Sequence, residues 1–111
     1  MKIRIDKKDS LIIIFVSGDI NAVTCEKLQE KIDELITNGN KHLLLDLAEV
    51  DYISSAGLRI ILATAKRLYN SGIFAVSRPK PTIREILEMV GLANIIAIYD
   101  TLEAAQKNLK K

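Results

Sequence analysis

The spacing of hydrophobic side chains divides the start of the chain into two strand-like segments. Ile3 and Ile5 alternate with charged residues, as in a strand that exposes one face. After a turn-like segment at 7–10 comes a continuous apolar run at 11–16, which is typical of a strand covered on both faces. Because the connection is short, we expect these two strands to form an antiparallel hairpin.

Helical and strand-like periods alternate along the rest of the chain. Apolar residues recur every three or four positions over 21–38 and over 55–69, which predicts two amphipathic helices. A third helix begins at Pro81, a residue suited to a first helical turn. Three further apolar segments have the length of strands, and they comprise residues 42–47, 73–76 and 95–99.

The predicted helix ends carry characteristic residues. Gly39 follows the first helix and Gly91 follows the third, where a left-handed backbone closes many helices. Asp100, with Glu103 three residues later, has the spacing of an N-cap pair for a last helix that runs through Leu109. The sequence therefore predicts about four helices.

The order of these segments, β-β-α-β-α-β-α-β-α, predicts an α/β fold. Strands joined through helices run parallel, and the helices pack on the sheet. We expect a sandwich with a mostly parallel five-stranded sheet, in which the first strand is an antiparallel edge. The 111 residues correspond to one domain, residues 1–111, with the 49% hydrophobic and 27% charged content of an ordinary globular protein.

Composition excludes several classes of protein. Lys and Arg total 16 and Asp and Glu total 14, for a net charge of +2, and the aromatic residues are three tyrosines and two phenylalanines. This balance argues against direct binding of nucleic acid. The apolar run at 11–16 is far shorter than the roughly 20 residues of a membrane span, and no secretory signal pattern opens the chain. We expect a cytoplasmic protein without membrane insertion.

Motifs of common catalytic sites are missing from the sequence. It has no P-loop, G-x-G-x-x-G, G-x-S-x-G or H-E-x-x-H pattern. His42 is the single histidine and begins a predicted strand, so a Ser–His–Asp triad with Ser54 or Ser55 has no supporting motif. We therefore predict that the protein is not an enzyme and that it needs no cofactor.

Potential metal ligands are also few. The single cysteine, Cys25, lies on the apolar stripe of the first helix and is interpreted as a core residue. Three aspartates lie near predicted strand ends, namely Asp19, Asp46 and Asp51. Aspartate at such positions usually forms turns or caps, so an acidic metal site is a weak alternative and we predict no metal ligands.

The most informative segment is Leu43–Leu68, in which a buried strand ends at Asp46 and two adjacent serines, Ser54 and Ser55, open a helix. One serine suits an N-cap and the other is then solvated. A phosphate here would meet the free amides and the positive end of the helix dipole. It would add a charge of about −1.5 to −2 without unfolding its own helix. A plain helix cap and a phosphorylation switch both fit this segment.

The helix over 55–69 presents two apolar faces. The predicted core face consists of residues at helical spacing, namely Leu58, Ile61, Leu62, Ala65, Leu68 and Tyr69. The opposite side carries small apolar residues edged by basic ones, namely Ala56, Ile60, Ala63, Arg59, Lys66 and Arg67. Such a stripe is either neutral surface or a place for a partner, and both interpretations expect Ile60 to be exposed.

The whole chain resembles the STAS family, the domain shared by anti-sigma factor antagonists and sulfate-transporter tails. The segments that carry the resemblance follow one another along the chain. They are Ser17-Gly18-Asp19-Ile20, Cys25-Glu26-Lys27-Leu28, Leu45-Asp46-Leu47, the loop-to-helix motif Ser54-Ser55-Ala56-Gly57-Leu58, and Val90-Gly91-Leu92. The serine-bearing motif in its strand–loop–helix setting is the most specific of them.

The resemblance implies that the protein is a bacterial anti-sigma factor antagonist. Such an antagonist binds, when unphosphorylated, an anti-sigma factor that is also an ATP-using serine kinase, and so frees the sigma factor and regulates transcription indirectly. Phosphorylation releases the antagonist, and a separate serine phosphatase resets it. By the same resemblance the phosphorylated residue is Ser55, with Ser54 the less favoured choice. We expect the protein to be a monomer or weak dimer, a point that the sequence leaves open.

The resemblance, together with the stripe on the helix over 55–69, predicts which residues surround the phosphorylation site and contact the partner. They are Asp19, Asn21, Asp46, Ser54, Ala56, Gly57, Arg59, Ile60 and Ala63. Ser54 stands where the best-known antagonists usually carry Asp, and Asn21 where an Asp commonly follows the second strand. Both departures remove negative charge from near Ser55, and our hypothesis is that they change which kinase is accepted.

Two alternatives share the expected fold. A constitutive STAS interaction subunit, for example of a lipid-transport ATPase complex, would dock without a phosphoserine switch and would use Ser55 only at the helix start. A phospho-aspartate receiver would use Asp46, but the first strand lacks the acidic pair that would hold Mg²⁺.

Overall fold

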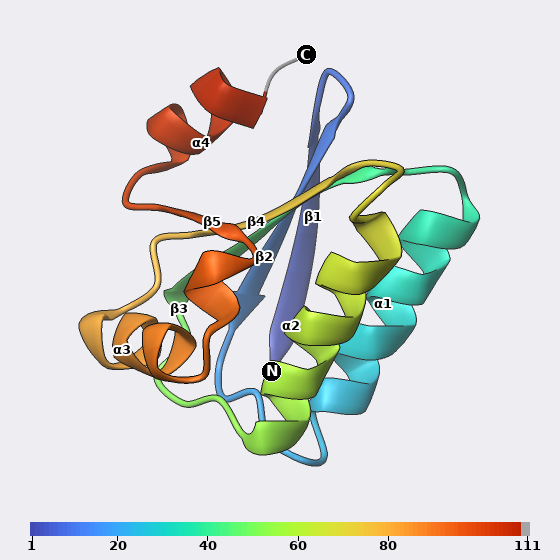
Figure 1. Ribbon diagram of the computed structural model, residues 1–111. Helices are drawn as coiled ribbons and strands as arrows, with labels where there is room; N and C mark the ends of the chain where they lie inside the picture. The colour runs from blue at the N-terminus through green and yellow to red at the C-terminus, as the bar shows by residue number, and fades with distance from the viewer. Residues whose placement is uncertain (110–111) are drawn as a thin grey trace.

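The computed structural model describes residues 1–109, and residues 110 and 111 of the predicted domain lie outside the described residues (Figure 1). The elements in chain order are β1 (Lys2–Lys8), β2 (Leu11–Ser17), α1 (Cys25–Thr37), β3 (His42–Glu49), α2 (Ser55–Leu68), β4 (Ile73–Ser77), α3 (Pro81–Met89), the 3-10 helix η1 (Leu92–Asn94), β5 (Ala97–Tyr99) and α4 (Leu102–Leu109). The predicted order of strands and helices is confirmed. None of the helices in residues 1–109 has the length and apolar character needed to cross a membrane.

The five strands form one sheet in the order β1-β2-β3-β4-β5. β1 pairs with β2 antiparallel, and the other neighbours pair in parallel. This confirms the predicted α/β fold with a mostly parallel sheet and an antiparallel edge strand. The central strands β2 and β3 are apolar on both faces because helices cover the sheet from both sides.

The helices are divided unequally between the two faces of the sheet. Helices α1, α2 and α3 share one hydrophobic core with β2, β3 and β4, whereas α4 covers the opposite face alone (Figure 1). The core under α4 is smaller and includes Leu11, Ile13, Leu44 and Ala75. The carboxyl ends of the parallel strands all meet at one edge, and the loop that leads into α2 leaves from this edge.

The segment after α3 differs from the predicted strand at 95–99. Gly91 has a φ of 82°, a left-handed conformation that turns the chain into η1. The amides of Ile95 and Ile96 donate to the Leu92 carbonyl at 3.0 Å each, so they are not available to the sheet. The fifth strand therefore begins at Ala97, two residues later than predicted, while Gly91 ends the preceding helix as predicted.

The N-cap of the last helix is Thr101 rather than the predicted Asp100. The Thr101 Oγ1 accepts a hydrogen bond from the Ala104 amide at 3.0 Å. The Asp100 carboxylate instead accepts a hydrogen bond from Arg84 at 2.7 Å. Asp100, which local spacing assigned to the cap, is thus engaged in an ion pair with Arg84 of α3.

Helix α2 is rotated relative to its predicted orientation. Its buried residues are Gly57, Ile60, Ile61, Thr64, Ala65 and Leu68, one position earlier than most of the predicted face. Ile60 is only 8% exposed, whereas Tyr69, which was predicted to be core, is 76% exposed. The predicted surface stripe of Ala56, Ile60 and Ala63 is therefore wrong at Ile60.

The rotation follows from what covers α2. The helix packs on the sheet and against α1, to which it is tied by an ion pair between Arg67 and Asp33. Thr64 is fully buried. Its polar hydroxyl is satisfied there because it donates a hydrogen bond to the Ile60 carbonyl at 2.7 Å. As a result, Leu58 and Leu62 are only half-buried: they pack against the edge of the core and also line a hollow beside the segment that follows α3.

Candidate functional site

The two serines lie where α2 begins, beside the carboxyl ends of β2 and β3. A short parallel bridge extends the pairing of these strands beyond their ends: the Ile20 amide donates to the Tyr52 carbonyl at 2.9 Å, and the Ser54 amide donates to the Ile20 carbonyl at 2.8 Å. Ile20 and Ile53 are buried at this bridge. The loop is therefore fixed at the residue that precedes the helix.

Gly57 lets the first turn of α2 approach this bridge. A Cβ at position 57 would lie 2.7 Å from Ile20 Cγ2 and 2.8 Å from Ile53 Cγ1, which is closer than real Cβ atoms come to other atoms. Only glycine fits here without movement of the buried isoleucines. Gly57 was predicted as part of the partner surface, but it is buried and serves to seat the helix.

Ser54 is the N-cap of α2. Its Oγ accepts a hydrogen bond from the Gly57 amide at 3.2 Å, and its carbonyl accepts one from the Leu58 amide at 2.9 Å. Its backbone is extended, as N-cap residues usually are. The Ser54 hydroxyl is therefore engaged in holding the helix start.

Ser55 is the first residue of the helix and is exposed to solvent. Its hydroxyl has no hydrogen-bond partner among residues 1–109. The first turn of α2 contains no acidic residue, and the exposed Arg59 lies one turn further along. A phosphate on Ser55 would thus meet free helix amides and a guanidinium group, both of which favour an anion.

The different positions of the two serines predict different effects on stability. We expect Ser54→Ala to lower the free energy of unfolding by about 1 kcal/mol, because an N-cap hydrogen bond is lost. Ser55→Ala should change it by less than about 0.5 kcal/mol, as is usual for a solvated surface side chain. Urea denaturation followed by circular dichroism measures both values. A larger loss for Ser55→Ala than for Ser54→Ala would contradict the assignment of the cap.

Asn21 closes the turn that precedes α1. Its Oδ1 accepts hydrogen bonds from the backbone amides of Val23 and Thr24 at 2.9 Å each. The Thr24 hydroxyl in turn accepts a hydrogen bond from the backbone amide of Asn21 at 2.9 Å. The Thr24 hydroxyl also donates to the Asp19 carbonyl at 2.7 Å. Because these residues form a turn, α1 begins at Cys25 and not at the predicted position 21. The Asp19 side chain is left exposed.

Asp46 lies on the sheet face opposite α2, so the structure does not bring it to Ser55. The carboxylate is 2% exposed and accepts hydrogen bonds from Ser77 Oγ at 2.8 Å and from Arg78 Nε and Nη2 at 2.8 and 3.1 Å. The hydrogen bond to Asp46 raises the pKa of the Arg78 guanidinium above its ordinary value. A carboxylate held in this way supports neither the receiver alternative nor a direct partner contact.

The other groups considered for chemistry lie apart. Asp51 is exposed and forms an ion pair with Lys80. No three His, Cys, Asp or Glu side chains gather into a metal-binding group within residues 1–109. Cys25 is buried, as expected of a core residue. His42 lies at the start of β3, the opposite end of the strand from the serines, so no Ser–His–Asp triad is assembled.

Apolar side chains are exposed on both sides of Ser55. Val23 and Tyr52 are 80% and 52% exposed in the loops on one side. On the other side, a groove of about 370 Å³ is lined by residues of α2 and of the segment after α3, namely Ser55, Leu58, Arg59, Leu62, Val90, Leu92 and Ile95. Periodicity missed this groove because it placed Leu58 and Leu62 in the core and residue 95 in a strand.

Comparison with known proteins agrees with these features. A family model described as the STAS domain matches residues 2–105. BtrV of Bordetella bronchiseptica, named as a candidate anti-sigma factor antagonist, is 35% identical over 99% of this chain and 96% of its own. The anti-sigma-F factor antagonist RsfB of Mycobacterium tuberculosis is 28% identical over 84% of this chain and 76% of its own.

A solved structure has the same fold. The crystal structure of an anti-sigma factor antagonist from Mycobacterium paratuberculosis superimposes with a TM-score of 0.92 and 27% sequence identity. The match covers 99% of this chain and 94% of that protein. The arrangement of the sheet and its helices is thus shared along the whole described chain.

Proposed function

We propose that this chain, which belongs to the STAS domain family, is an anti-sigma factor antagonist whose partner binding is controlled by phosphorylation of Ser55. One observation carries the proposal. Of two adjacent serines at the start of α2, Ser54 is engaged as the helix cap, whereas Ser55 is exposed, unpartnered within residues 1–109, and at the rim of an apolar groove. Relatives named as anti-sigma factor antagonists support the general role.

The proposed modification is a transfer of a phosphoryl group from ATP. The Ser55 Oγ attacks the γ-phosphorus, a new Oγ–P bond forms, and the bond to the β-bridging oxygen breaks, so that ADP leaves. The hydroxyl proton passes to a base of the partner kinase. Exposure of Ser55 supports this step, because its hydroxyl is accessible to another protein. ATP and Mg²⁺ belong to the kinase, and a phosphatase later hydrolyses the phosphate.

The phosphate would change the surface and leave the fold in place. It carries a charge of about −1.5 to −2, which the helix N-terminus and Arg59 favour. Docking of a partner over the groove would, however, remove water from this charge, and desolvation of an imperfectly paired charge is costly. We therefore expect the affinity for the partner to fall while α2 stays folded.

We propose that the partner contacts the surface around Ser55. Of the residues expected to surround it, Asp19, Arg59 and Ala63 are exposed, and Asn21, Ser54 and Ala56 are half-buried. Gly57, Ile60 and Asp46 are buried and support this surface from below or from the other face of the sheet. Neutral Asn21 and Ser54 leave Ser55 with less negative charge nearby, and we propose that this selects the kinase.

Mass spectrometry after incubation with kinase and ATP tests the modification. The kinases are the anti-sigma factors of the serine-kinase type from the source organism, each mixed with the wild-type protein, Ser55→Ala and Ser54→Ala. We expect one phosphate on the wild type and on Ser54→Ala, and at least a hundredfold less on Ser55→Ala. These variants differ by one hydroxyl at neighbouring positions, so each is the matched control for the other.

Two outcomes would overturn this proposal. Full phosphorylation of Ser55→Ala would assign the modified residue to Ser54 or another position. A wild-type protein that binds a partner stably but accepts phosphate from none of these kinases would instead support the constitutive interaction subunit, in which Ser55 only begins the helix.

A further inference from the structure

Strand β1 forms a free edge of the sheet. It pairs with β2 along its seven residues, and no other strand within residues 1–109 pairs with its outer side. The strand at the opposite edge, β5, has only three residues and so offers little backbone for pairing. The edge of β1 is about 23 Å long at 3.3 Å per residue, long enough to accept a strand from another molecule.

The hairpin turn determines which backbone groups of β1 face outward. Lys8 pairs with Leu11 across the two-residue turn at 9–10. In such a hairpin the pair that closes the turn exchanges both of its hydrogen bonds, and hydrogen-bonded and non-hydrogen-bonded pairs alternate from there. The groups directed away from β2 are therefore the amides and carbonyls of Ile3, Ile5 and Lys7.

The side chains of β1 give its two faces different character. On the face toward α1, Ile3 and Ile5 are half-buried against the core that α1 and α2 share with the sheet. On the other face, Lys2 and Arg4 are exposed. The Arg4 guanidinium lies 4.0 Å from the centre of the Phe15 ring, which keeps it beside the strand. An added strand thus meets an apolar surface on one face and a basic surface on the other.

A hollow of about 450 Å³ beside the basic face leaves room for long acidic side chains. Its charged lining residues are Lys2, Arg4, Arg78, Asp46 and Glu49. Asp46 is already paired with Arg78, so two cations, Lys2 and Arg4, face the one remaining carboxylate of Glu49.

The charge of β1 indicates the chemistry of the occupant. The strand carries four basic residues, Lys2, Arg4, Lys7 and Lys8, against one acidic residue, Asp6, for a net charge of +3. The three lysines form no ion pair with any residue from 1 to 109, and the Arg4–Asp6 pair, at 3.8 Å, is exposed to solvent. A second copy of the chain would bring the same +3 and be repelled, so the occupant is an acidic segment.

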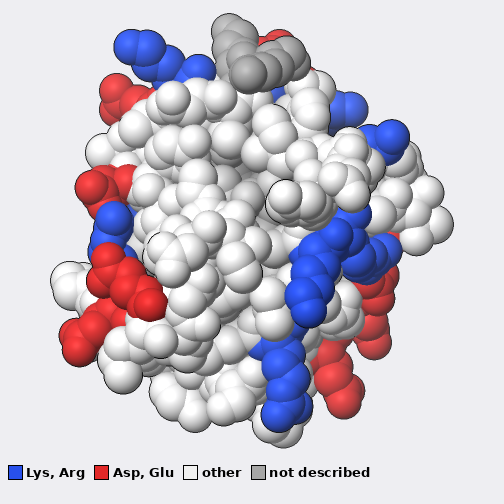
Figure 2. All heavy atoms as spheres, viewed as in Figure 1, with Lys and Arg blue, Asp and Glu red and all other residues white. Residues whose placement is uncertain are grey.

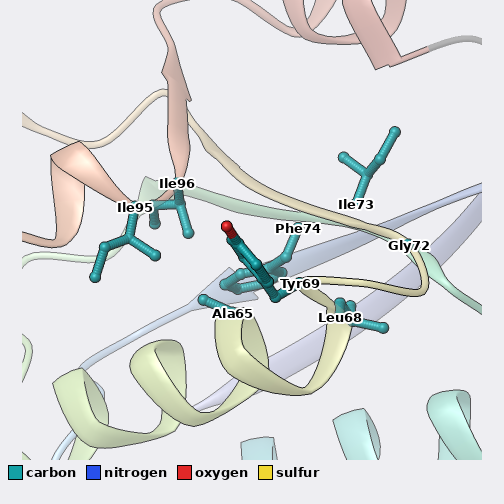
Figure 3. Close-up of a pocket in the computed structure, with 8 residues that line it drawn as sticks. All are labelled: Ala65, Leu68, Tyr69, Gly72, Ile73, Phe74, Ile95 and Ile96. Carbon is teal, nitrogen blue, oxygen red and sulfur yellow. The ribbon is translucent and has the colours of Figure 1, made fainter.

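An apolar hollow elsewhere on the surface gives no such indication of an occupant. It has a volume of about 190 Å³ at the Tyr69 end of α2, and none of its eight lining residues is charged (Figure 3). Figure 2 shows the surface between α2 and α3 as mainly uncharged. The edge of β1, in contrast, specifies both the sign and the spacing of the charges that bind to it.

We propose that the edge of β1 binds an extended segment of another protein, in which acidic and apolar residues alternate, as an added antiparallel strand. The apolar side chains of this segment lie beside Ile3 and Ile5. Its acidic side chains lie beside Lys2, Arg4 and Lys8. Antiparallel pairing is favoured because it is slightly more stable per residue than parallel pairing.

One position of the segment is not acidic. The residue opposite Asp6 is basic or neutral, because like charges directly opposite each other destabilise a strand pair. None of the β1 residues belongs to the surface proposed around Ser55, so this inference does not depend on phosphorylation.

Two capped synthetic heptapeptides test the edge in the full chain. The first, Glu-Val-Lys-Val-Glu-Val-Glu, places glutamates opposite Lys2, Arg4 and Lys8 and its lysine opposite Asp6 when it pairs antiparallel. The second has the reversed sequence, so its composition and charge are identical, but antiparallel pairing sets its lysine against Arg4 and a glutamate against Asp6. We expect the first to bind about fivefold more tightly, as measured by NMR titration of the ¹⁵N-labelled protein.

Backbone pairing has a signature that charge attraction alone lacks. With the first peptide at saturation, hydrogen exchange at the amides of Ile3, Ile5 and Lys7 should slow at least about fivefold, while exchange at Arg4 and Asp6 stays unchanged. The valine amides of the peptide face β1 in this pairing, and the glutamate amides face solvent. N-methylation of the valines should therefore abolish binding, and N-methylation of the glutamates should leave it within about threefold.

Two protein variants with the same change of charge complete the test. Lys2→Glu should weaken binding of the first peptide about threefold or more, whereas Lys66→Glu, at an exposed position of α2, should bind within about twofold of wild type. Absence of saturable binding, unchanged exchange at the three outward amides, or equal losses in the two variants would overturn the proposal. Tighter binding of the reversed peptide would overturn the antiparallel direction.

Discussion

Ile60→Glu will lower the free energy of unfolding by at least about 3 kcal/mol. Ile60 is 8% exposed and belongs to the core cluster shared by α1, α2 and the sheet. Loss of a buried aliphatic side chain costs about 2–5 kcal/mol, and a carboxylate in its place adds a desolvation penalty. Against a total stability of about 5–15 kcal/mol for a domain of this kind, a loss of this size removes a large share of the free energy of unfolding, and the variant will unfold at a much lower urea concentration. Urea denaturation measures the loss.

Two glutamate variants on the same helix are controls for Ile60→Glu. Ala63→Glu introduces the same charge at an exposed position and should change the free energy of unfolding by less than about 0.5 kcal/mol. Leu62→Glu alters a half-buried residue that lines the groove beside Ser55, and its effect should fall between the two. A stable Ile60→Glu protein that loses only its partner would contradict the buried position and would restore the Ala56–Ala63 stripe as the partner surface.

The fold was predictable because its strongest signals are local. The apolar run at 11–16 is too continuous for a half-exposed strand, and it is buried by helices on both faces. Helical periods between short apolar segments then require parallel strands joined by crossovers. What local patterns could not show is which residue ends each element. The amides of Ile95 and Ile96 donate to the Leu92 carbonyl, so they cannot pair with the neighbouring strand. Asp100 forms an ion pair with Arg84, so it does not cap the last helix.

The rotation of α2 shows a limit of hydrophobic periodicity. Gly57 and Thr64 count as non-hydrophobic in the sequence, yet both are buried. Gly57 is buried because Ile20 and Ile53 approach it closely. Thr64 tolerates burial because its hydroxyl donates a hydrogen bond to the Ile60 carbonyl of its own helix. Leu58 and Leu62 count as hydrophobic and stay half-exposed. A face chosen by hydrophobicity is therefore displaced by about one residue. The error falls on the residues that form the candidate interaction surface.

The candidate phosphorylation site was predictable in position but not in detail. The Ser54-Ser55 pair marks a helix start from sequence alone. Which serine caps the helix depends on the bridge between Ile20 and Ile53, residues that are distant in sequence and fix the loop in space. Asp46 was grouped with this site because the strand that carries Asp46 leads into the serine-bearing loop. Alternation of side chains along the strand directs Asp46 to the other face of the sheet, where it forms an ion pair with Arg78.

Phosphorylation of Ser55 will lower the affinity for the anti-sigma factor about a hundredfold without unfolding α2. The reason is local: leaving a charge poorly paired at an interface costs several kcal/mol, and a hundredfold change corresponds to about 2.8 kcal/mol. The helix itself tolerates the phosphate, because its first turn has no acidic residue and its free amides and Arg59 attract the charge.

The decisive measurement compares the dissociation constants of the fully phosphorylated and the unphosphorylated protein for the same anti-sigma factor, with the phosphate located by mass spectrometry. Circular dichroism of both forms checks that the helix content is equal, and phosphatase treatment of the phosphorylated sample provides the matched control. The account predicts binding about a hundredfold weaker when Ser55 carries phosphate, with full recovery after the phosphatase. Equal affinity of the two folded forms would contradict it.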